Sequence, residues 1–550
     1  MDEESAYAGR WVARLRGKII AQGSTPEEAK CAAQRIRHKE TPEIVFMPPT
    51  QGFFDPLLET IAAALPADQP LYLVGGAVRD RLLNRHTHDL DFVLPGDALA
   101  IGRRLSKVLD AAYYPLDEER GTARLILKTA DGTRLFLDFA SYRGADLESD
   151  LCGRDFTINA MAWDIRSHTL IDILGGAKDL KDKILRACSP STFEDDPVRI
   201  LRAVRQAAAF GLHILPETRQ AMRQAREQLL RVSPERLRDE IFRILEGPRP
   251  SACLRALDIL GILPLLFPEL PALKGVTQPP PHVHDAWTHT LAVLDHLEII
   301  LNALAPTYDP EKAADLLNGL LVLRLGRYRQ QIGAHLDSDI VPERSLRGLL
   351  FLAALYHDVS KPASSILDEN GGLHFYGHDK AGAEVIARRS SAFHFSSDEI
   401  KRLKIIVANH MRFHFHVKRL NEENKEPTRR AIYRFFRAAD SAGVDLVLLG
   451  LADLRATYEQ TLPQETWKAA LDIARTLLEN WWEKPEETVA PPRLLTGTDL
   501  INEFALTPGP QIGALLEAVR EAQAIGLIIN RAQALEFVRQ RLSETAQGEK

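Results

Sequence analysis

The stretch LYLVGGAVRDRLLNRHTHDLDFVL, residues 71–94, decides the fold of the first half of this chain. It joins two apolar runs, and the second contains an Asp-Leu-Asp triplet. Because side chains at i and i+2 of a strand point to the same side, Asp89 and Asp91 would present two carboxylates together. Two hard oxygen ligands suit Mg²⁺ when substrate phosphates complete its shell. A lone Asp-x-Asp is more often a solvated strand end or turn, so its meaning depends on the surrounding residues.

The surroundings favour phosphate chemistry. Gly75 and Gly76 stand where the first apolar run meets an amphipathic segment. Glycines at a strand-to-helix junction leave backbone N–H groups open to phosphate. Further on, RLFLDFASYRG, residues 134–144, places Asp138 in another predicted strand. A third carboxylate on a neighbouring strand is what a two-metal phosphoryl-transfer site needs. Together these features predict a nucleotidyl-transfer site.

Four more segments follow in order: GRDFTINAMAWD, IDILGGAKDLKDKILRAC, FEDDPVRILRAVRQAAAFGL and SPERLRDEIFRIL, beginning at residues 153, 171, 193 and 233. With the first stretch, this series resembles the class II tRNA nucleotidyltransferase and bacterial poly(A) polymerase family over about residues 71–270. The resemblance implies a polymerase-β-like head followed by helical neck and body segments. It also implies template-independent addition of C and/or A, from CTP and ATP, to the tRNA 3′ end with Mg²⁺.

By motif position, the resemblance implies that Asp89 and Asp91 bind the catalytic metals, with Asp138 beside them. It implies a nucleotide-binding set of Gly75, Gly76, Arg79, Arg154, Asp155, Asp196, Arg199 and Arg202. The paired basic residues that the family carries before DFTINA are reduced here to Gly153-Arg154. One of the contacts that the family makes with the phosphate or the sugar of the nucleotide is therefore not expected in this chain.

Base reading also follows from the chemistry of two residues. Asp196 and Arg199 are three apart and share a face if Pro197 begins a helix. A carboxylate accepts from the exocyclic amine of C or A, and a guanidinium donates to the ring acceptor of the same base. G and U present the opposite polarity. The alternative is that Asp196 stabilises the helix dipole, with Arg199 as its ion-pair partner.

A second set of chemical groups follows a proline cluster, residues 279–281, that is typical of a linker. Histidines and carboxylates recur in apolar segments, and their burial is costly unless they bind something. These segments are HDAWTHTL, LLFLAALYHDVSKP, FYGHDKAGAE, IIVANHMRFHFH and LLGLADLRATY. They resemble an HD-type metal phosphohydrolase domain over about residues 283–458.

This resemblance implies that His289, His357, Asp358 and Asp453 form the basic metal set. His378 and His410 match additional histidines of HD domains with larger sites. The implied metal is Mn, Ni, Co or Fe, or Mg²⁺. The implied activity is hydrolysis of small phosphate esters, with 2′,3′-cyclic phosphates as the test substrates that the resemblance favours. Taken alone, each of the separate histidines would more often be an ordinary core or surface residue.

The net charge of −6 is not the global signature of a nucleic-acid binder, so RNA binding would need local basic faces. Arg219, Arg223 and Arg226, at i, i+4 and i+7, are the predicted RNA-binding face. A second candidate face holds Arg429, Arg430, Arg434 and Arg437. Either could instead be an ordinary solvated helix face. Bound RNA would gain salt-dependent affinity and little sequence selectivity from such arginines.

The expected fold is α+β, multidomain and predominantly helical. The predicted domains are an accessory ββαβ-like module (1–50), the head (55–190), a neck and body that reads bases and binds RNA (191–275), an all-helical HD domain (283–460) and a helical tail (461–550). Nothing approaches 18 continuous apolar residues, the N-terminus lacks an apolar signal segment, and the four cysteines are scattered. A cytoplasmic protein without a membrane span is therefore expected, and no protein partner is predicted.

Several functions remain open. Addition of CCA, of CC only, of A only or of poly(A) is poorly separated by sequence. The short stretch between Asp138 and Arg154 favours the CC-only type, since many CCA-adding relatives carry a longer loop there. A protein of another class, an RNA-binding or regulatory protein with an inactive head, is disfavoured because the carboxylates are intact.

Overall fold

The computed structural model describes residues 11–15, 18–23, 26–36, 42–46, 56–85, 87–128, 132 and 134–548. The chain forms two compact units, residues 1–228 and residues 229–550. The first combines sheets and helices and the second is almost entirely helical, which confirms the predicted fold class. Within the described residues, no helix is both long and apolar enough to span a membrane.

The first unit begins with a small antiparallel sheet of strand order β2-β1-β3, against which one helix packs. Its elements are β1(Trp11–Leu15), β2(Lys18–Gly23), α1(Pro26–Ile36) and β3(Glu43–Phe46). Ala29 and Ala33 of the helix are one turn apart and fully buried, so they form its packing face. Much of the predicted module of residues 1–50 lies outside the described residues.

The main sheet of the first unit has seven strands in the order β10-β9-β4-β5-β8-β7-β6. Only β5 and β8 pair in parallel. The strands are β4(Tyr72–Val74), β5(Asp89–Leu94), β6(Ala112–Asp117), β7(Thr122–Lys128), β8(Arg134–Ser141), β9(Ala162–Asp164) and β10(Thr169–Ile171). Along β5 the buried residues Leu90 and Phe92 alternate with Asp89 and Asp91, and Phe92 stacks on Phe139 at 4.9 Å between ring centroids. One face of the sheet is thus in the core. The other face is open at Asp89 and Asp91, while Val93 further along it is buried in a smaller apolar cluster with Leu151.

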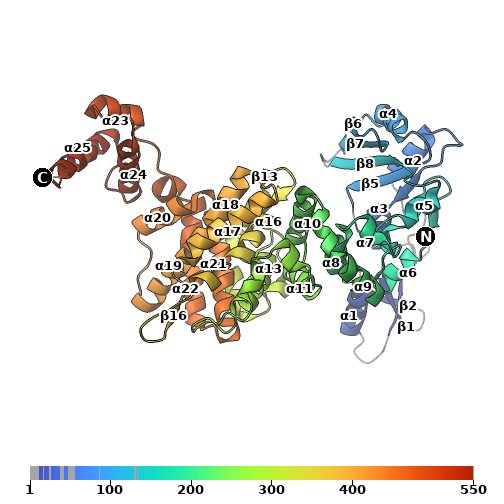
Figure 1. Cartoon of the computed structure of the whole chain (residues 1–550), viewed down its shortest axis with the longest axis horizontal. Helices are drawn as coiled ribbons and strands as arrows, with labels where there is room; N and C mark the ends of the chain where they lie inside the picture. Colours follow the sequence, from blue (N-terminus) through green and yellow to red (C-terminus); the bar gives the residue numbers. More distant parts are fainter. Residues whose placement is uncertain are drawn as a thin grey trace. The chain divides into compact units, whose positions relative to one another are not determined.

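Helices lie over both faces of the sheet and extend beyond it (Figure 1). They are α2(Pro56–Ala64), α3(Gly76–Leu82), α4(Ala98–Val108), α5(Leu147–Cys152), α6(Gly176–Lys181), α7(Thr192–Asp195), α8(Arg199–Phe210) and α9(Pro216–Ala225), with the short strands β11(Ile184–Leu185) and β12(His213–Ile214). The side chain of Asp97 caps α4, which packs on β7 and β8. Helix α8 begins at Arg199 and not at Pro197, so Asp196 lies outside the helix and the predicted shared helix face is wrong. The helix ends at Gly211, whose φ of 63° suits glycine.

The second unit is built from helices, with two short two-stranded sheets and several single-turn helices between them. The helices are α10(Pro234–Glu246), α11(Pro250–Ile259), α12(Leu263–Leu266), α13(Ala286–Ala303), α14(Leu316–Leu325), α15(Arg329–Asp337), α16(Leu346–Tyr356), α17(His378–Ala392), α18(Ser397–Asn409), α19(Met411–Glu423), α20(Arg429–Ala439), α21(Gly443–Tyr458), α22(Gln464–Trp482), α23(Gly497–Phe504), α24(Pro510–Ala524) and α25(Arg531–Gly548). The strands are β13(Asp339–Val341), β14(Arg344–Ser345), β15(Ile366–Leu367) and β16(Leu373–His374).

Helix α21 lies at the centre of this unit. It packs against α13, α19 and α22, and its residues from Gly443 to Thr457 are all buried. A helix that is buried all round must satisfy any polar side chain it carries internally, and Asp453 is such a residue. Helices α23, α24 and α25 share an apolar core of their own around Leu500 and Val538.

The close approach of α19 and α21 depends on one glycine. A Cβ added at Gly450 would lie 2.4 Å from Cδ1 of Phe413, whose ring is fully buried. We expect Gly450→Ala to lower the free energy of unfolding by about 1–3 kcal/mol because the ring has little room to move. Denaturant unfolding followed by tryptophan fluorescence measures this change.

The matched control is Gly513→Ala on α24, where an added Cβ meets nothing within 4 Å. This variant should be neutral or slightly stabilising, because alanine favours a helix by roughly 0.5–1 kcal/mol over glycine. Equal stability of the Gly450 variant and the wild type would contradict the packing described here.

Candidate active sites

Three carboxylates meet on the open face of the main sheet. Asp91 of β5 pairs directly with Asp138 of β8 in parallel register, and Asp89 lies two residues away on the same face. Partial removal from water raises the pKa of Asp91, and the carboxylate of Asp138 raises it further. Crowded carboxylates of this kind fit divalent cations, which would relieve their repulsion. The structure therefore brings the three predicted catalytic residues together.

Asp138 has a counter-charge that the sequence analysis missed. Arg124 lies opposite Asp138 on β7 and donates two hydrogen bonds to its carboxylate, from Nε and Nη2, each 2.8 Å long. This bidentate geometry fixes the orientation of the carboxylate. The third acidic residue is thus held in place by a neighbouring strand before any metal binds.

The first glycine of the pair already has a backbone partner. The N–H of Gly75 donates to the carbonyl of Met161 at 3.4 Å, and phosphate binding by Gly75 and Gly76 stays a prediction. Gly75 has a φ of 71°, and an added Cβ would lie 3.1 Å from Nη1 of Arg154 and 3.5 Å from Oδ2 of Asp91. The absence of a side chain at position 75 therefore allows Arg154 to approach the acidic face.

Two ion pairs organise the residues predicted to hold the nucleotide. Arg154 contacts the buried carboxylate of Asp150 at 2.9 Å, and Arg202 contacts Asp155 at 2.8 Å. Burial alone would raise the pKa of Asp155, but the Arg202 guanidinium and the Asn159 amide hold it below its usual value. Asp155 is thus ionised, and Arg202, Asn159 and the Phe156 N–H all bind its carboxylate.

Arg79 is also engaged inside the protein. Its Nη1 donates to Oδ1 of Asn159 at 2.6 Å, and its guanidinium lies over the ring of Phe210 at 4.2 Å from the centroid. Asn159 donates in turn to Asp155 and to Gln206, both at 2.9 Å. This chain of contacts joins α3 to α8. The structure therefore places Arg79 as a link between the glycine turn and the helix that starts at Arg199.

The predicted base-reading residues lie at a junction between helices. Asp196 directly follows α7, and Arg199 is the first residue of α8. Arg199 donates to the carbonyls of Gly153 at 2.9 Å and Arg154 at 3.2 Å. The Asp196 carboxylate accepts from the Val198 N–H at 3.3 Å. Arg199 is thus fixed against the loop that carries Arg154.

The two basic faces differ. Arg219 and Arg223 of α9 are exposed, and Arg226 after them is half-buried. The α20 arginines instead bind glutamates from later in the chain. These pairs are Arg429–Glu487, Arg430–Glu521, Arg434–Glu521 and Arg437–Glu517. Most of the α20 charge therefore helps to dock α24, which the sequence analysis did not foresee.

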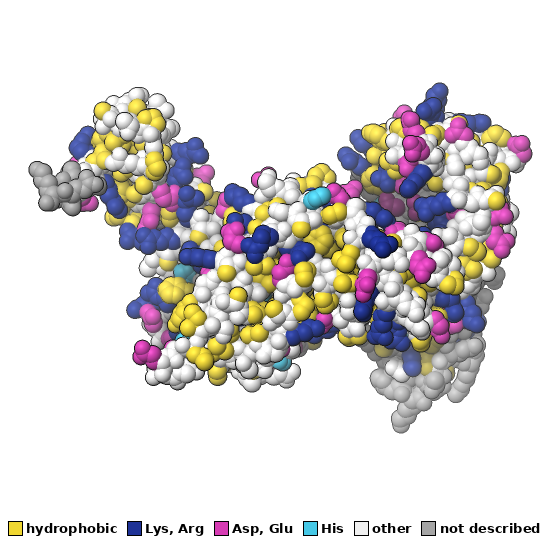
Figure 2. Space-filling view, viewed as in Figure 1, with side chains coloured by type: hydrophobic (Ala, Val, Ile, Leu, Met, Phe, Trp, Pro, Cys, Tyr) yellow, Lys and Arg dark blue, Asp and Glu magenta, His cyan; other side chains and the backbone are white. Residues whose placement is uncertain are grey.

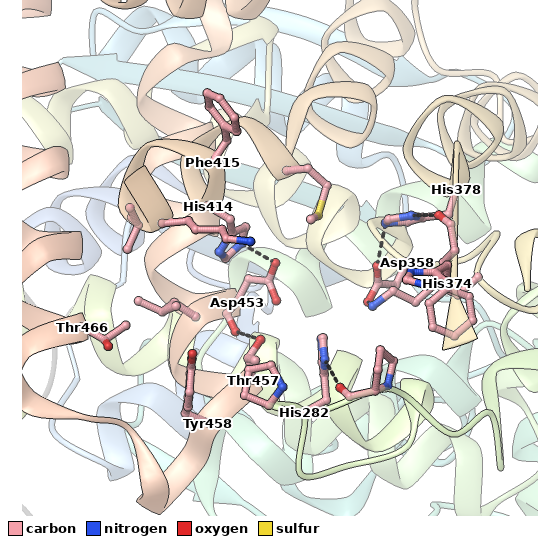
Figure 3. A pocket seen from close by; sticks show the side chains of 18 of the residues that line it. His282, Asp358, His374, His378, His414, Phe415, Asp453, Thr457, Tyr458 and Thr466 are labelled. Carbon is pink, nitrogen blue, oxygen red and sulfur yellow. Dashed lines mark hydrogen bonds and ion pairs between the residues drawn. The ribbon is translucent and has the colours of Figure 1, made fainter. Parts of the chain in front are cut away.

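The six residues predicted for the HD site come together in two buried groups that could each hold a metal ion (Figure 3 shows three of the six). They come from α13, from the end of α16, from the start of α17, from the α18–α19 junction and from α21. The first group is His289, His357 and Asp453, and the second is Asp358, His378 and His410.

Asp358 joins the two groups. Its Oδ2 lies 3.1 Å from Nε2 of His357 and its Oδ1 lies 3.3 Å from Nε2 of His378. Nε2 of His289 lies 3.0 Å from Oδ1 of Asp453. Both ring nitrogens of His289 and Nε2 of His357 are buried without a hydrogen bond of good geometry. Buried polar atoms left in this state fit a metal-binding centre.

The imidazoles are oriented by the backbone. Nδ1 of His357, His378 and His410 each donates to the carbonyl three residues earlier, at 2.7 Å. These bonds direct each Nε2 toward the centre, as is common around metal-binding histidines. Burial, together with the neighbouring His357, lowers the pKa of His410 to about 3, so its ring is neutral and can act as a ligand at pH 7.

The carboxylates of the centre are ionised. Although burial opposes ionisation, His357 and Lys361 hold the pKa of Asp358 well below its usual range, and Nζ of Lys361 lies 2.6 Å from its Oδ2. His414 was not selected in the sequence analysis, yet its Nε2 lies 2.7 Å from Oδ2 of Asp453. Its spacing from His410, i to i+4 on a helical segment, is the signal that could have identified it.

A cavity of about 690 Å³ opens beside Asp358, His378, Asp453 and His414. Most of its wall is apolar or aromatic, with Met411, Phe415 and Tyr458 among the lining residues. The volume is that of a small-molecule or nucleotide site. His282, another residue that the sequence analysis missed, also lines it (Figure 3).

Three separate parts of the chain match models of known protein families. Residues 71–186 match the poly(A) polymerase head domain, residues 211–273 match a probable RNA- and SrmB-binding site of poly(A) polymerase, and residues 286–435 match the HD domain. Among solved structures, a CCA-adding enzyme with CTP covers 89% of this chain and 96% of its own, with 21% identity and a TM-score of 0.55. At that identity the likeness shows the fold alone.

Two curated relatives align over most of their length. An A-adding tRNA nucleotidyltransferase from Deinococcus radiodurans is 32% identical over 86% of this chain and 96% of its own. A CC-adding tRNA nucleotidyltransferase from Thermus thermophilus is 31% identical over 84% of this chain and 92% of its own. With the acidic site of the head and the buried histidine centre in place, these alignments show that the chain belongs to the tRNA nucleotidyltransferase family and carries an HD domain.

Proposed function

We propose that the head adds C and/or A nucleotides, from CTP and ATP, to the 3′ end of tRNA without a nucleic-acid template. The observation that carries this proposal is the in-register pairing of Asp91 with Asp138, with Asp89 on the same face. The donor set is entirely oxygen, which suits Mg²⁺. Bound Mg²⁺ would supply activation of the attacking hydroxyl and charge stabilisation at the leaving pyrophosphate.

The remaining residues act on the nucleotide. Arg154 reaches the acidic face past Gly75 and is the cation placed to meet a phosphate there. Arg202 is oriented by the ionised Asp155. Asp196 and Arg199 supply one acceptor and one set of donors, the polarity that C and A share. Arg219, Arg223 and Arg226 would bind the tRNA backbone.

The selection of C and A gives a testable prediction. We expect Arg199→Ala to reduce discrimination of CTP and ATP against UTP and GTP by about 10–100-fold, since one base contact is worth roughly 1–3 kcal/mol. Incorporation of each nucleotide, measured separately at saturating tRNA, gives the ratio. The control is Arg120→Ala, which removes an exposed arginine from the β6–β7 turn. Unchanged selectivity with only a lower melting temperature would show that Arg199 is structural.

Which nucleotides are added is a separate question. Residues 142–146 alone connect β8 to α5, and the capping box of Asp146 and Ser149 closes the start of that helix. This short connection favours the CC-only type, while the relatives above include both a CC-adding and an A-adding enzyme. Poly(A) addition is a further alternative, because the head and RNA-binding models are those of poly(A) polymerase.

The experiment uses two tRNA transcripts, one ending at the discriminator base and one ending in CC. Each is incubated with CTP, with ATP and with both, and the 3′ ends are sequenced. A CC-adding enzyme extends only the first transcript and only with CTP, whereas an A-adding enzyme extends only the second with ATP. No extension of either transcript would refute the proposed activity.

For the second unit we infer a metal-dependent phosphohydrolase. The observation that favours it is the pair of buried ligand groups joined by Asp358 beside a large cavity. A mixed set of imidazoles and carboxylates suits Mn, Ni, Co or Fe, with Mg²⁺ as the oxygen-preferring alternative. Such a metal would supply a hydroxide near neutral pH. Asp453 and His414, 2.7 Å apart, can hold or move a proton beside it.

A further inference from the structure

A second cavity lies beside the HD cavity, between α19 and α20, with a volume of about 370 Å³. Four arginines line it, and its lining contains no Asp or Glu. They are Arg412 and Arg419 of α19 and Arg430 and Arg434 of α20. Figure 2 shows Lys and Arg side chains gathered where these two helices lie in Figure 1.

The positive charge of this cavity exceeds that of its acidic partners. Arg430 and Arg434 share one carboxylate, that of Glu521, at 3.0 and 2.7 Å. Arg412 donates to the neutral amide of Asn409, and Arg419 forms an ion pair with Glu423 at 3.6 Å, so the four arginines have two carboxylate partners among them. The arginines also affect His416, which lines the same cavity. Burial, and then Arg419 and Arg412, lower the pKa of His416 to about 4.

One aromatic side chain joins this cavity to the HD cavity. Phe415 lines both, and it is 58% exposed although it is large and apolar. In Figure 3 it lies on the side of the HD cavity away from Asp358 and His378, next to His414. An exposed ring between a metal centre and an arginine cavity offers a stacking surface for a nucleobase, with phosphate-binding groups beyond it.

We propose that the arginine cavity binds the phosphodiesters that precede the 3′-terminal nucleotide of an RNA, and that the HD centre acts on that terminus in preference to free mononucleotides. The terminal nucleotide occupies the HD cavity, a base stacks on Phe415, and the upstream phosphates meet Arg412 and Arg419. This inference rests on the proposed phosphohydrolase. Guanidinium groups bind phosphate oxygens in bidentate pairs, and a mononucleotide is too short to use them.

The reaction on a terminal 2′,3′-cyclic phosphate balances with water as the only co-reactant. A water oxygen bonds to phosphorus, the bond from phosphorus to one ribose oxygen breaks, and that oxygen takes the proton that the water loses. The product is a terminal phosphomonoester with one free ribose hydroxyl. Binding of upstream phosphates does not enter this step and acts only through kcat/KM.

The first test compares kcat/KM for a 2′,3′-cyclic mononucleotide with kcat/KM for di- and trinucleotides that end in the same group. We expect the trinucleotide to be favoured by about tenfold or more, because remote binding energy raises kcat/KM. In Arg412→Ala/Arg419→Ala this ratio should fall by about tenfold, and the advantage should shrink with added salt. The matched control is Arg388→Ala/Arg475→Ala, which removes two exposed arginines that line neither cavity.

The second test does not require hydrolysis. A tetranucleotide with a 3′-phosphate and 4-thiouridine at its second-last position is crosslinked to the full chain, and the attached peptides are identified by mass spectrometry. Crosslinks should fall in residues 411–435 and disappear in the Arg412/Arg419 variant but not in the control.

These tests separate the two proposals. Crosslinking at α19 and α20 without hydrolysis of any substrate supports the RNA site and refutes the phosphohydrolase. Hydrolysis that is independent of chain length, or a trinucleotide advantage that the control variant loses equally, overturns the RNA site. Loss of head activity in the Arg412/Arg419 variant would reveal unfolding, so Arg412→Lys/Arg419→Lys, which keeps both charges, is assayed beside it and should retain part of the trinucleotide advantage.

Discussion

Replacement of Asp91 by Ala or Asn is expected to lower nucleotide addition by at least ~10³-fold, because a lost metal ligand removes several kcal/mol of charge stabilisation. The same holds for Asp89. Asp91 lies opposite Asp138 in the parallel β5–β8 pair, in the middle of the group of three carboxylates. Incorporation of radiolabelled CTP and ATP into tRNA measures the loss.

The Asn variants keep the shape of the side chain and separate charge from packing. Removal of a carboxylate from this crowded group should not destabilise the fold, since burial and Asp138 already raise the pKa of Asp91. Glu119→Gln, in the exposed β6–β7 turn, is the control for loss of an acidic group elsewhere in the head. Incorporation within a few-fold of wild type in both Asp89 and Asp91 variants would remove these residues from the catalytic site.

Replacement of His357 or Asp358 by Ala is expected to abolish hydrolysis of 2′,3′-cyclic phosphates and to lower the bound metal content. The carboxylate of Asp358 is close to members of both ligand groups. Its Oδ2 lies 3.1 Å from Nε2 of His357 and its Oδ1 lies 3.3 Å from Nε2 of His378, so its loss would affect both groups. Loss of one ligand typically costs several kcal/mol in transition-state charge stabilisation. Hydrolysis is measured with Mg²⁺, Mn²⁺, Ni²⁺ and Co²⁺, and metal content by mass spectrometry.

The control for these variants is His394→Ala, an exposed histidine outside both ligand groups. Circular dichroism must accompany each assay, because removing one member of a buried charged set can destabilise the unit. Wild-type protein that binds no divalent metal and hydrolyses nothing with any of the four would reduce this domain to a structural role.

Sequence periodicity correctly predicted that some of these residues lie on the same face of a strand. Asp89 and Asp91 lie on one face of β5 as the i, i+2 rule requires. The six HD residues lie in five segments over more than 160 positions of the chain, and their association came from the family resemblance, because no local pattern predicts such contacts.

Other contacts could not be predicted because they depend on register or on distant partners. Arg124 faces Asp138 only because β7 and β8 pair in one particular register. The α20 arginines resemble a solvated RNA-binding face until Glu517 and Glu521 of α24 are placed beside them. The N–H of Gly75 donates to the carbonyl of Met161, and nothing in the sequence indicates that these two residues are neighbours.

The measurement that tests the central claim most directly is a crossed assay of three proteins: wild type, Asp91→Asn and His357→Ala. Each is assayed for CTP and ATP addition to tRNA and for hydrolysis of a 2′,3′-cyclic phosphate. The two sites use separate ligand sets in separate units of the chain, so we expect Asp91→Asn to lose only addition and His357→Ala to lose only hydrolysis. Loss of both activities in either folded variant, or of neither, would contradict two independent metal-dependent sites.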